Sequence, residues 1–174
     1  VKMLNGNLYV TECLGLSGGY SDAVLEKISK IARDNNINQI LVEQNFGGGM
    51  FAELLKPFLM RFHPCQVEDV RNNKTKELRI IDTLEPVMNS HRLIIDRKVI
   101  EKDFRSNPQE TPERRLKLQL VYQLSRISRH RGSLVHDDLV DSLAGAVAYW
   151  TDYMAQDEDK NIRNRKDQLL MTHL

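Results

Sequence analysis

The sequence predicts an α/β fold, and three observations carry this prediction. Short runs of β-branched and aliphatic residues recur along the chain, and they alternate with longer segments whose apolar residues repeat at helical spacing. A hydrophobic content of 41% over 174 residues suffices for one compact domain with its own core. One apolar run ends directly in an acid, at the strand end where α/β folds place their chemistry.

The first half of the chain predicts alternating strands and helices. Ser21 is a good N-cap for a helix with an apolar inner face, and Pro57 is expected to mark a kink or a helix junction. The predicted elements are a strand over 7–16, a helix over 21–35, a strand over 38–43, a helix over 51–62 and a strand over 65–70.

The second half is predicted to be mostly helical. Its predicted elements are a helix over 76–88, a short strand over 92–96, a helical turn over 98–104, a loop over 106–112, a helix over 113–128 and a helix from about 137 to 154. We expect the strand residues Leu8, Val10, Ile40, Val42, Val67 and Val70 to share one sheet, against which Leu143, Val147 and Trp150 pack. The predicted domain covers 1–155, and 156–174 is expected to be a charged C-terminal tail or a fraying helix.

The segment from His136 to Asp141 places three carboxylates and an imidazole within six residues at the start of an apolar helix. With a helix start near Asp137, the acids at 137, 138 and 141 share one face. The opposite face is expected to be buried, through Leu139, Leu143, Ala146, Val147, Trp150 and Met154. Carboxylate oxygens favour hard divalent cations such as Mg²⁺ or Mn²⁺ over zinc. The alternative is ordinary capping, because aspartates are common in the first turn of a helix.

Glu43 is the second candidate acid. It ends the predicted strand over 38–43 and precedes the glycines 47–49, which turn the chain into the next helix. This turn is not a Walker-type phosphate loop, because no Gly-Lys-Ser/Thr follows the glycines. The alternative for Glu43 is a solvated loop acid beside a flexible turn.

Basic residues gather in two places despite a formal net charge of only +1. Cations that flank a carboxylate cluster would straddle a phosphate backbone, which predicts double-stranded DNA as the partner. Aromatic residues make up 6% of the chain and form no stripe, so stacking on single strands is not expected. The alternative is a solvated basic face. The candidate DNA-binding residues are Arg71, Lys74, Lys76, Arg79, Arg126, Arg129 and Arg131.

Cysteine usage and hydropathy indicate a cytoplasmic protein. Cys13 and Cys65 lie in apolar runs without metal-ligand spacing, so they are predicted to be reduced core residues and not zinc ligands. No apolar stretch approaches the roughly 18 residues of a membrane span, and the first residues lack a signal-peptide profile. We therefore expect no membrane partner.

Three segments, over 41–51, 81–88 and 136–144, together resemble the C-terminal nuclease domain of a phage terminase large subunit, the DNA maturase of short-tailed phages. The resemblance covers the chain up to about Tyr153, with the segments in the family's order. It implies a ribonuclease H-like fold with a mixed central sheet flanked by helices. It also implies a metal-dependent endonuclease that cuts concatemeric double-stranded DNA during packaging in the host cytoplasm. The implied partners are the terminase ATPase domain, the small terminase subunit and the portal.

The resemblance also implies roles for the acids. Glu43 matches the acid after the family's second core strand, and the late metal-binding acid falls first on Asp138 and second on Asp141. Asp137 is a further candidate ligand, and His136 could orient a ligand or shuttle a proton, unless it is a simple capping residue. Two Mg²⁺ or Mn²⁺ ions held by such acids would serve phosphodiester hydrolysis by activating water and stabilising the leaving oxygen.

One departure from the family concerns its first catalytic Asp, which lies on a strand just before the one that here begins near Asn7. No Asp lies between Val1 and Asn7. We therefore expect the chain to begin inside the domain, without the family's first strand, as a fragment, a prophage remnant or a shortened chain. Such a chain would be weakly active or inactive. A non-catalytic DNA-binding or motor-docking module with a degenerate nuclease site is accordingly the alternative function, and another ribonuclease H-like enzyme such as a junction resolvase is a third.

Overall fold

The computed structural model describes residues 1–44, 49–71 and 75–171, with the side chains of the last helix described as far as residue 163 except 161. The chain folds as two compact units. The first unit combines Val1–Cys13 with Lys76–Leu174, and the second unit is Leu14–Thr75. The α/β class predicted from the sequence is confirmed, because both units combine strands with helices.

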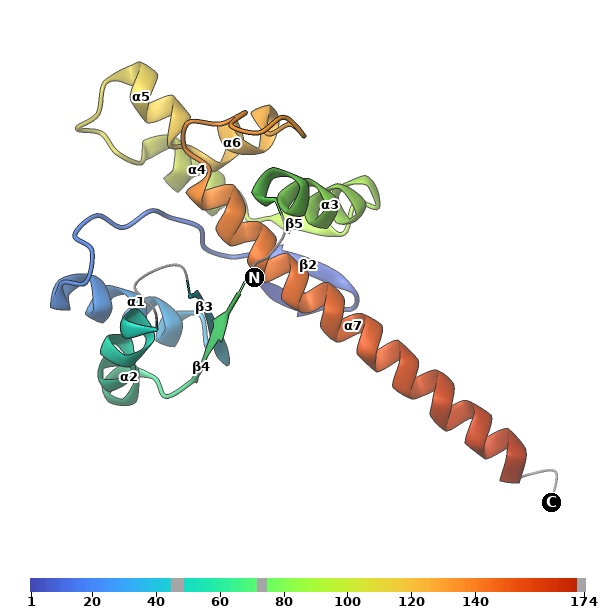
Figure 1. The fold of residues 1–174 in the computed structure, drawn as a ribbon. Coiled ribbons are helices and arrows are strands. Elements are labelled where there is room, and N and C mark those ends of the chain that lie inside the picture. The colour runs from blue at the N-terminus through green and yellow to red at the C-terminus, as the bar shows by residue number, and fades with distance from the viewer. Residues whose placement is uncertain (45–48, 72–74, 172–174) are drawn as a thin grey trace. The chain divides into compact units, whose positions relative to one another are not determined.

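A small mixed sheet forms the centre of the first unit (Figure 1). Strand β1 (Lys2–Leu4) pairs antiparallel with β2 (Asn7–Val10) through a tight turn in which Asn5 and Gly6 have φ angles of 51° and 76°. Positive φ at both positions is typical of the two-residue hairpin turns that match strand twist. Strand β5 (Leu93–Ile95) then pairs in parallel with β2.

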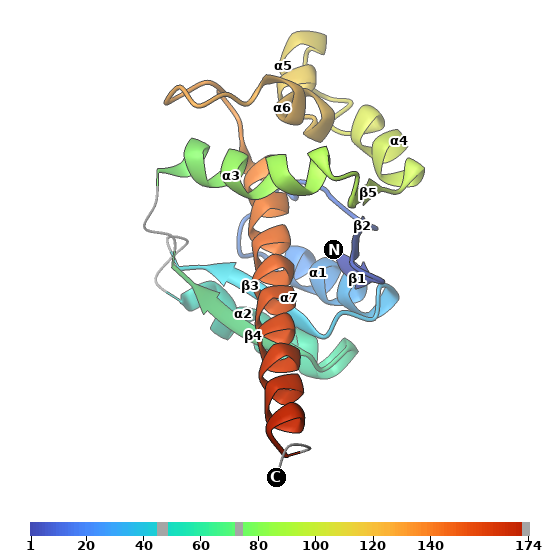
Figure 2. The same ribbon diagram turned by 90° about the vertical axis from the view of Figure 1, so that its right-hand side faces the viewer.

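The described residues of the first unit include the helices α3 (Lys76–Asn89), α4 (Arg97–Arg105), α5 (Pro112–Lys117), α6 (Leu120–Arg126) and α7 (Asp138–Met171). Helix α3 crosses α7 near the amino-terminal end of α7 (Figure 2). The core of the unit comprises Leu8, Val10, Ile80, Leu84, Val87, Val99, Leu120, Val140, Leu143, Ala144 and Val147, and Trp150 packs against it. The predicted packing of α7 on the β2 strand is therefore confirmed.

The second unit contains α1 (Asp22–Asp34), β3 (Gln39–Glu43), α2 (Met50–Phe62) and β4 (Gln66–Val70). Strands β3 and β4 are parallel, as expected for strands joined by a crossover helix. Its core consists of Leu25, Ala32, Leu55 and Leu59, with Ile40 and Val67 of the two strands packed against it. Helix α2 continues through Pro57.

The prediction of one sheet is wrong for the residues that the structure describes. All six predicted residues lie in strands, but β3 pairs with β4 in a two-stranded sheet, separate from the β1-β2-β5 sheet. Each sheet packs against a hydrophobic cluster of its own, which is the physical counterpart of the division into two units.

Three elements also differ from the prediction. The strand expected over 7–16 ends at Val10, because its partner β5 ends at Ile95, after which Asp96 caps α4 by accepting from the Lys98 N–H at 2.8 Å. Strand β1 was not predicted, and the expected helical turn over 98–104 is the complete helix α4.

The single helix expected over 113–128 is divided into α5 and α6. The buried carboxylate of Asp103 causes the division. It accepts hydrogen bonds from the backbone N–H groups of Leu120 and Val121 at 2.8 and 3.1 Å, and so begins a new helix there.

Helix α7 continues to Met171. Of the two interpretations of 156–174, a charged tail or a helix, this agrees with the helix. The domain limits 1–155 and 156–174 stay a prediction. In the part of the chain that is described, no helix is both long and apolar enough to cross a membrane. Both cysteines are free and half-buried, and burial raises the pKa of the Cys13 thiol to about 12.

Candidate metal and DNA site

The acidic segment opens α7 and stands on an anchored helix. The carbonyl of Asp137 accepts the first helical hydrogen bond, from the Asp141 N–H at 2.9 Å, so Asp137 occupies the N-cap position. The side chains of Val140, Leu143 and Val147 are buried in the core on the other side of the helix. The predicted amphipathic arrangement is therefore present. Of the acids, Asp138 is exposed, Asp137 is half-buried and Asp141 retains only 9% of its accessible surface.

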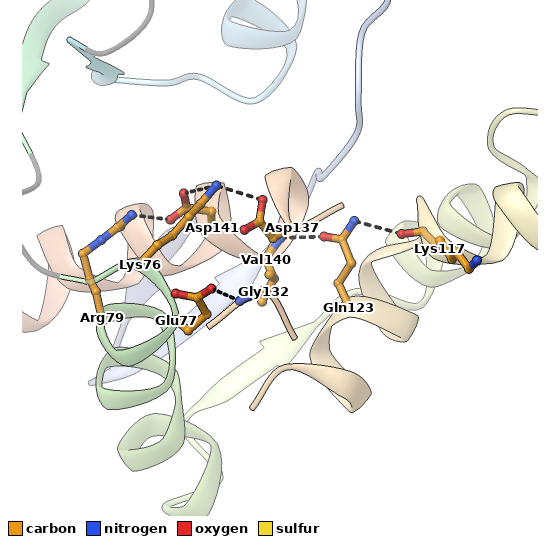
Figure 3. Close-up of polar contacts among 9 residues, drawn as sticks. All are labelled: Lys76, Glu77, Arg79, Lys117, Gln123, Gly132, Asp137, Val140 and Asp141. Atoms are coloured by element: carbon orange, nitrogen blue, oxygen red, sulfur yellow. Dashed lines mark hydrogen bonds and ion pairs between the residues drawn. The ribbon is translucent and has the colours of Figure 1, made fainter. Parts of the chain in front are cut away.

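Helix α3 brings two cations to these acids (Figure 3). Lys76 Nζ lies 2.8 Å from Asp137 Oδ1 and 3.3 Å from Asp141 Oδ2. Arg79 donates to Asp141 Oδ1 at 2.6 Å. The Arg79 and Asp141 side chains are only 13% and 10% exposed, so both oxygens of a nearly buried carboxylate are occupied by cations of the same chain.

The electrostatic balance at Lys76 favours the ammonium. Burial alone lowers its pKa, but the hydrogen bond to Asp137 and the charges of Asp141 and Asp137 act the other way and prevail, so the pKa of Lys76 lies above its ordinary value. Lys76 is thus a stable positive charge between two carboxylates. A divalent cation is not needed to neutralise this pair of acids.

A second contact fixes the start of α7 from the opposite side. The side-chain oxygen of Gln123, on α6, accepts a hydrogen bond from the Val140 N–H at 3.0 Å. Gln123 is 1% exposed and Val140 is fully buried. A backbone donor that has no partner within its helix is thereby satisfied away from water.

The turn that precedes the acids is held by α3 as well. Glu77 is nearly buried and accepts from the Gly132 N–H at 2.6 Å, a hydrogen bond that lowers the pKa of Glu77. Arg129, in the same turn, lies 3.0 Å from Asp82 and 3.2 Å from Glu85. Helix α3 therefore holds both the acidic helix start and the basic turn in front of it.

Glu43 belongs to the second unit, at the carboxyl end of β3 as predicted. Its neighbour Gln44 donates its backbone N–H to Val70 of the adjacent strand and contacts Arg71 through its side chain. Gly49 begins α2 with a φ of +89°, a left-handed conformation that side chains disfavour. The turn glycines 47 and 48 lie outside the described residues.

The predicted site residues have different surroundings. Ion pairs join Lys76 to both Asp137 and Asp141, and Arg79 to Asp141. The two cations were predicted as DNA contacts, and whether they bind DNA stays a prediction. Arg71, Arg126 and Arg131 are exposed, His136 is half-buried, and Lys74 lies outside the described residues.

No three His, Cys, Asp or Glu side chains form a group that could hold a metal ion within residues 1–44, 49–71 and 75–171. The convergence of Glu43 with Asp138 and Asp141 stays a prediction.

Sequence reasoning missed two residues of this region, Gln123 and Glu77. Both lie in helices among polar neighbours, where a Gln or Glu is usually solvated. The signal that could have found them is their position on the apolar side of the helical repeat. Gln123 lies three residues from buried Leu120, and Glu77 lies three residues from buried Ile80.

Two comparisons with known proteins agree on one family. The family model described as "Terminase Bacteriophage T7, Ribonuclease H-like domain" matches residues 1–93. These residues include Glu43 and all strands of both sheets except the last two residues of β5. The terminase large subunit of Enterobacteria phage T3 is 38% identical over 157 residues, which cover 90% of this chain and 27% of that protein. The chain therefore spans about a quarter of the length of this relative.

Proposed function

Because the chain belongs to the family of ribonuclease H-like domains of T7-type terminases, we propose that it is the endonuclease domain of a viral DNA-packaging terminase. Its reaction is the metal-dependent hydrolysis of phosphodiester bonds in concatemeric double-stranded DNA. The single observation that carries the proposal is the acidic start of α7, where an exposed aspartate stands on a helix anchored in the core of a domain of this family.

The surroundings of the acids favour Asp138 as the ligand that α7 contributes. Asp138 is exposed, whereas both oxygens of Asp141 are occupied by Arg79 and Lys76. Its carboxylate oxygens are donors that Mg²⁺ and Mn²⁺ accept, so the donor chemistry fits the ions that the family implies. Glu43 would supply the second carboxylate, and Asp137 a third if Lys76 moves away. Two bound ions would supply an activated water and charge neutralisation at the leaving oxygen.

The chain's own residues have separate tasks in this proposal. Arg79 keeps Asp141 in place and so fixes the acidic turn relative to α3. Arg126 and Arg131 are exposed before the acids, where they would bind the phosphates on either side of the cut. His136, half-buried beside Asp137, would orient a carboxylate or carry a proton.

The partners proposed for the domain are those of a packaging machine. They are double-stranded DNA, a terminase ATPase domain, the small terminase subunit and the portal, in the host cytoplasm. Support for them comes from the family and from the relative, which is named as a terminase large subunit.

A non-catalytic DNA-binding or motor-docking module is the second candidate. The ion pairs of Asp137 and Asp141 with Lys76 and Arg79 favour it, because they neutralise most of the acidic cluster without a metal ion. In this case the α7 start would be a structural junction, and the exposed arginines would still bind the DNA backbone.

A plasmid-nicking assay with Mn²⁺ or Mg²⁺ separates the two functions. It uses this chain and a version extended upstream to the family's acidic strand. Glu43→Gln and Asp138→Asn keep the side-chain size and remove the charge, so both should abolish cutting. Asp152→Asn, at an exposed position further along α7, is the matched control and should cut normally. Activity that survives both substitutions, or that never appears with either metal, would favour the binding module.

A further inference from the structure

The start of α7 is capped in an unusual way. A helix leaves its first backbone N–H groups without partners, and the side chain of the N-cap residue commonly accepts from the N–H two or three positions later. At α7 the N-cap residue is Asp137, and the third position is Val140. The carboxylate of Asp137 contacts Lys76, however, and the Val140 N–H is bound by Gln123 (Figure 3).

Gln123 thus performs the capping that Asp137 would perform in an ordinary helix. The contact joins two helices over 17 residues of sequence and lies in the buried interior, since Gln123 is 1% exposed. An acceptor in such a place cannot be replaced by water without opening the core. The Asp137 carboxylate is thereby left to pair with Lys76.

Gln123 is itself held in a fixed position. Its amide donates to the Lys117 carbonyl at 3.4 Å, and the start of its own helix is capped by the buried carboxylate of Asp103. A chain of buried polar contacts therefore runs from α4 through α6 to the first turn of α7. This chain of contacts ends one peptide bond from Leu139 and two from Asp138.

We propose that Gln123 is a positioning residue for the metal site at the start of α7. By binding the Val140 N–H it fixes the direction in which the first turn presents Asp138, and it keeps the Asp137 carboxylate out of a capping bond. The proposal rests on the proposed nuclease function, since it assigns Gln123 a role toward the ion that Asp138 would hold. Partners that orient metal ligands commonly change metal affinity by about 10–100-fold when they are removed.

Two substitutions at position 123 and one matched control test the proposal on the full chain without DNA. Gln123→Met keeps the side-chain length and removes the acceptor, and Gln123→Glu keeps an acceptor at a helix start that favours negative charge. Gln119→Met is the control, because Gln119 is also buried but its amide binds the Phe104 carbonyl and not α7. The readouts are Mn²⁺ affinity, from the paramagnetic resonance signal of the free ion, and hydrogen exchange of the Val140 amide.

Gln123→Met should weaken Mn²⁺ binding by about tenfold or more and speed exchange at Val140 by about tenfold. Gln123→Glu keeps the acceptor for the Val140 N–H but loses the bond to the Lys117 carbonyl, so it should restore both in part, and Gln119→Met should change neither. Unchanged Mn²⁺ affinity in Gln123→Met would overturn the proposal even if exchange speeds up, because Gln123 would then be a structural cap only. If Gln123→Met does not fold, Gln123→Glu decides: Val140 protection and Mn²⁺ affinity that change together support the role, and Val140 protection that is lost while Mn²⁺ affinity stays unchanged contradicts it.

The failure of the proposed function has a different signature. If the unmodified chain and its upstream extension bind no Mn²⁺ at all, the nuclease assignment fails and the positioning role falls with it. If the extended chain binds Mn²⁺ and is insensitive to position 123, only the positioning role is wrong.

Discussion

The ion pair between Arg79 and Asp141 should be one of the most costly contacts to break in the first unit. The two side chains are 13% and 10% exposed and 2.6 Å apart, so Arg79→Met would leave a carboxylate nearly buried and missing its closest partner. Breaking a buried ion pair in this way costs about 3–5 kcal/mol. Because Lys76 remains 3.3 Å from Asp141, we expect a loss near the lower end, about 3 kcal/mol in the free energy of unfolding.

A double-mutant cycle measures this coupling. Arg79→Met and Asp141→Leu are made singly and together, and urea unfolding is followed by the fluorescence of Trp150, the only tryptophan of the chain. The double variant should recover most of the stability lost by Arg79→Met, because it leaves no unpaired buried charge. A coupling energy below about 0.5 kcal/mol would refute the reasoning, since the pair would then behave as a solvated surface contact.

The ion pair between Arg79 and Asp141 also predicts that Asp138 and Asp141 contribute differently to metal affinity. Asp141→Asn should reduce Mn²⁺ affinity much less than Asp138→Asn, because Asp141 already has two cationic partners and Asp138 is exposed. Direct Mn²⁺ titration of folded protein checks this order. Equal losses in both variants would make Asp141 a ligand as well as an ion-pair partner.

Single contacts in the first unit set three further expected outcomes. The hydrogen bond from the Gly132 N–H lowers the pKa of Glu77 from 4.5, so the stability that this bond adds is present above pH 4.5 and is lost as the pH falls through the lowered pKa. Glu77→Gln should therefore flatten the loss of stability in acid, measured by urea titrations between about pH 3 and 6. An unchanged loss of stability would contradict this role of Glu77. Arg126→Ala should lower the log–log salt slope of duplex binding by up to about one unit, and Arg129→Ala by less, because Arg129 is already paired with acids of α3; equal slopes would contradict this order. Asp103→Ala should cost about 1–2 kcal/mol in thermal unfolding, since two N–H groups at the α6 start lose their acceptor, and a loss within error would show that water replaces it.

The start of α7 could be predicted because its signal is local. The apolar residues behind the acids recur every three or four positions, and this period alone places the acids on the outer face. Strand β3 could be predicted for the same reason, and Glu43 lies at its end as expected. The dipeptide Asn5-Gly6 is typical of two-residue hairpin turns, so the turn between β1 and β2 could also be predicted from the sequence, although strand β1 was not.

The features that sequence reasoning missed depend on contacts between distant residues. No Gly or Pro marks the break at Leu118, because the break is set by Asp103, which lies 17 residues before Leu120. The acidic partners of Lys76 lie more than 60 residues away in the sequence. The sequence therefore does not distinguish a solvated lysine from one that forms ion pairs with the acids of α7. The formation of two sheets likewise depends on two separate cores, which periodicity within one element cannot reveal.

The first unit is assembled from both ends of the sequence, which has a consequence for biosynthesis. Strand β2 is central to its sheet, yet its parallel partner β5 is made more than 80 residues later. When β2 emerges from the ribosome, the edge that will pair with β5 has no partner. The contiguous segment 14–75 has more local contacts and is synthesised in full before β5, so it can collapse first. The order of synthesis therefore favours folding of the second unit before the acids of α7 acquire their supports. Nascent chains long enough to expose residues 14–75 outside the ribosome, but not yet residue 93, would have this unit formed and the mixed sheet still open.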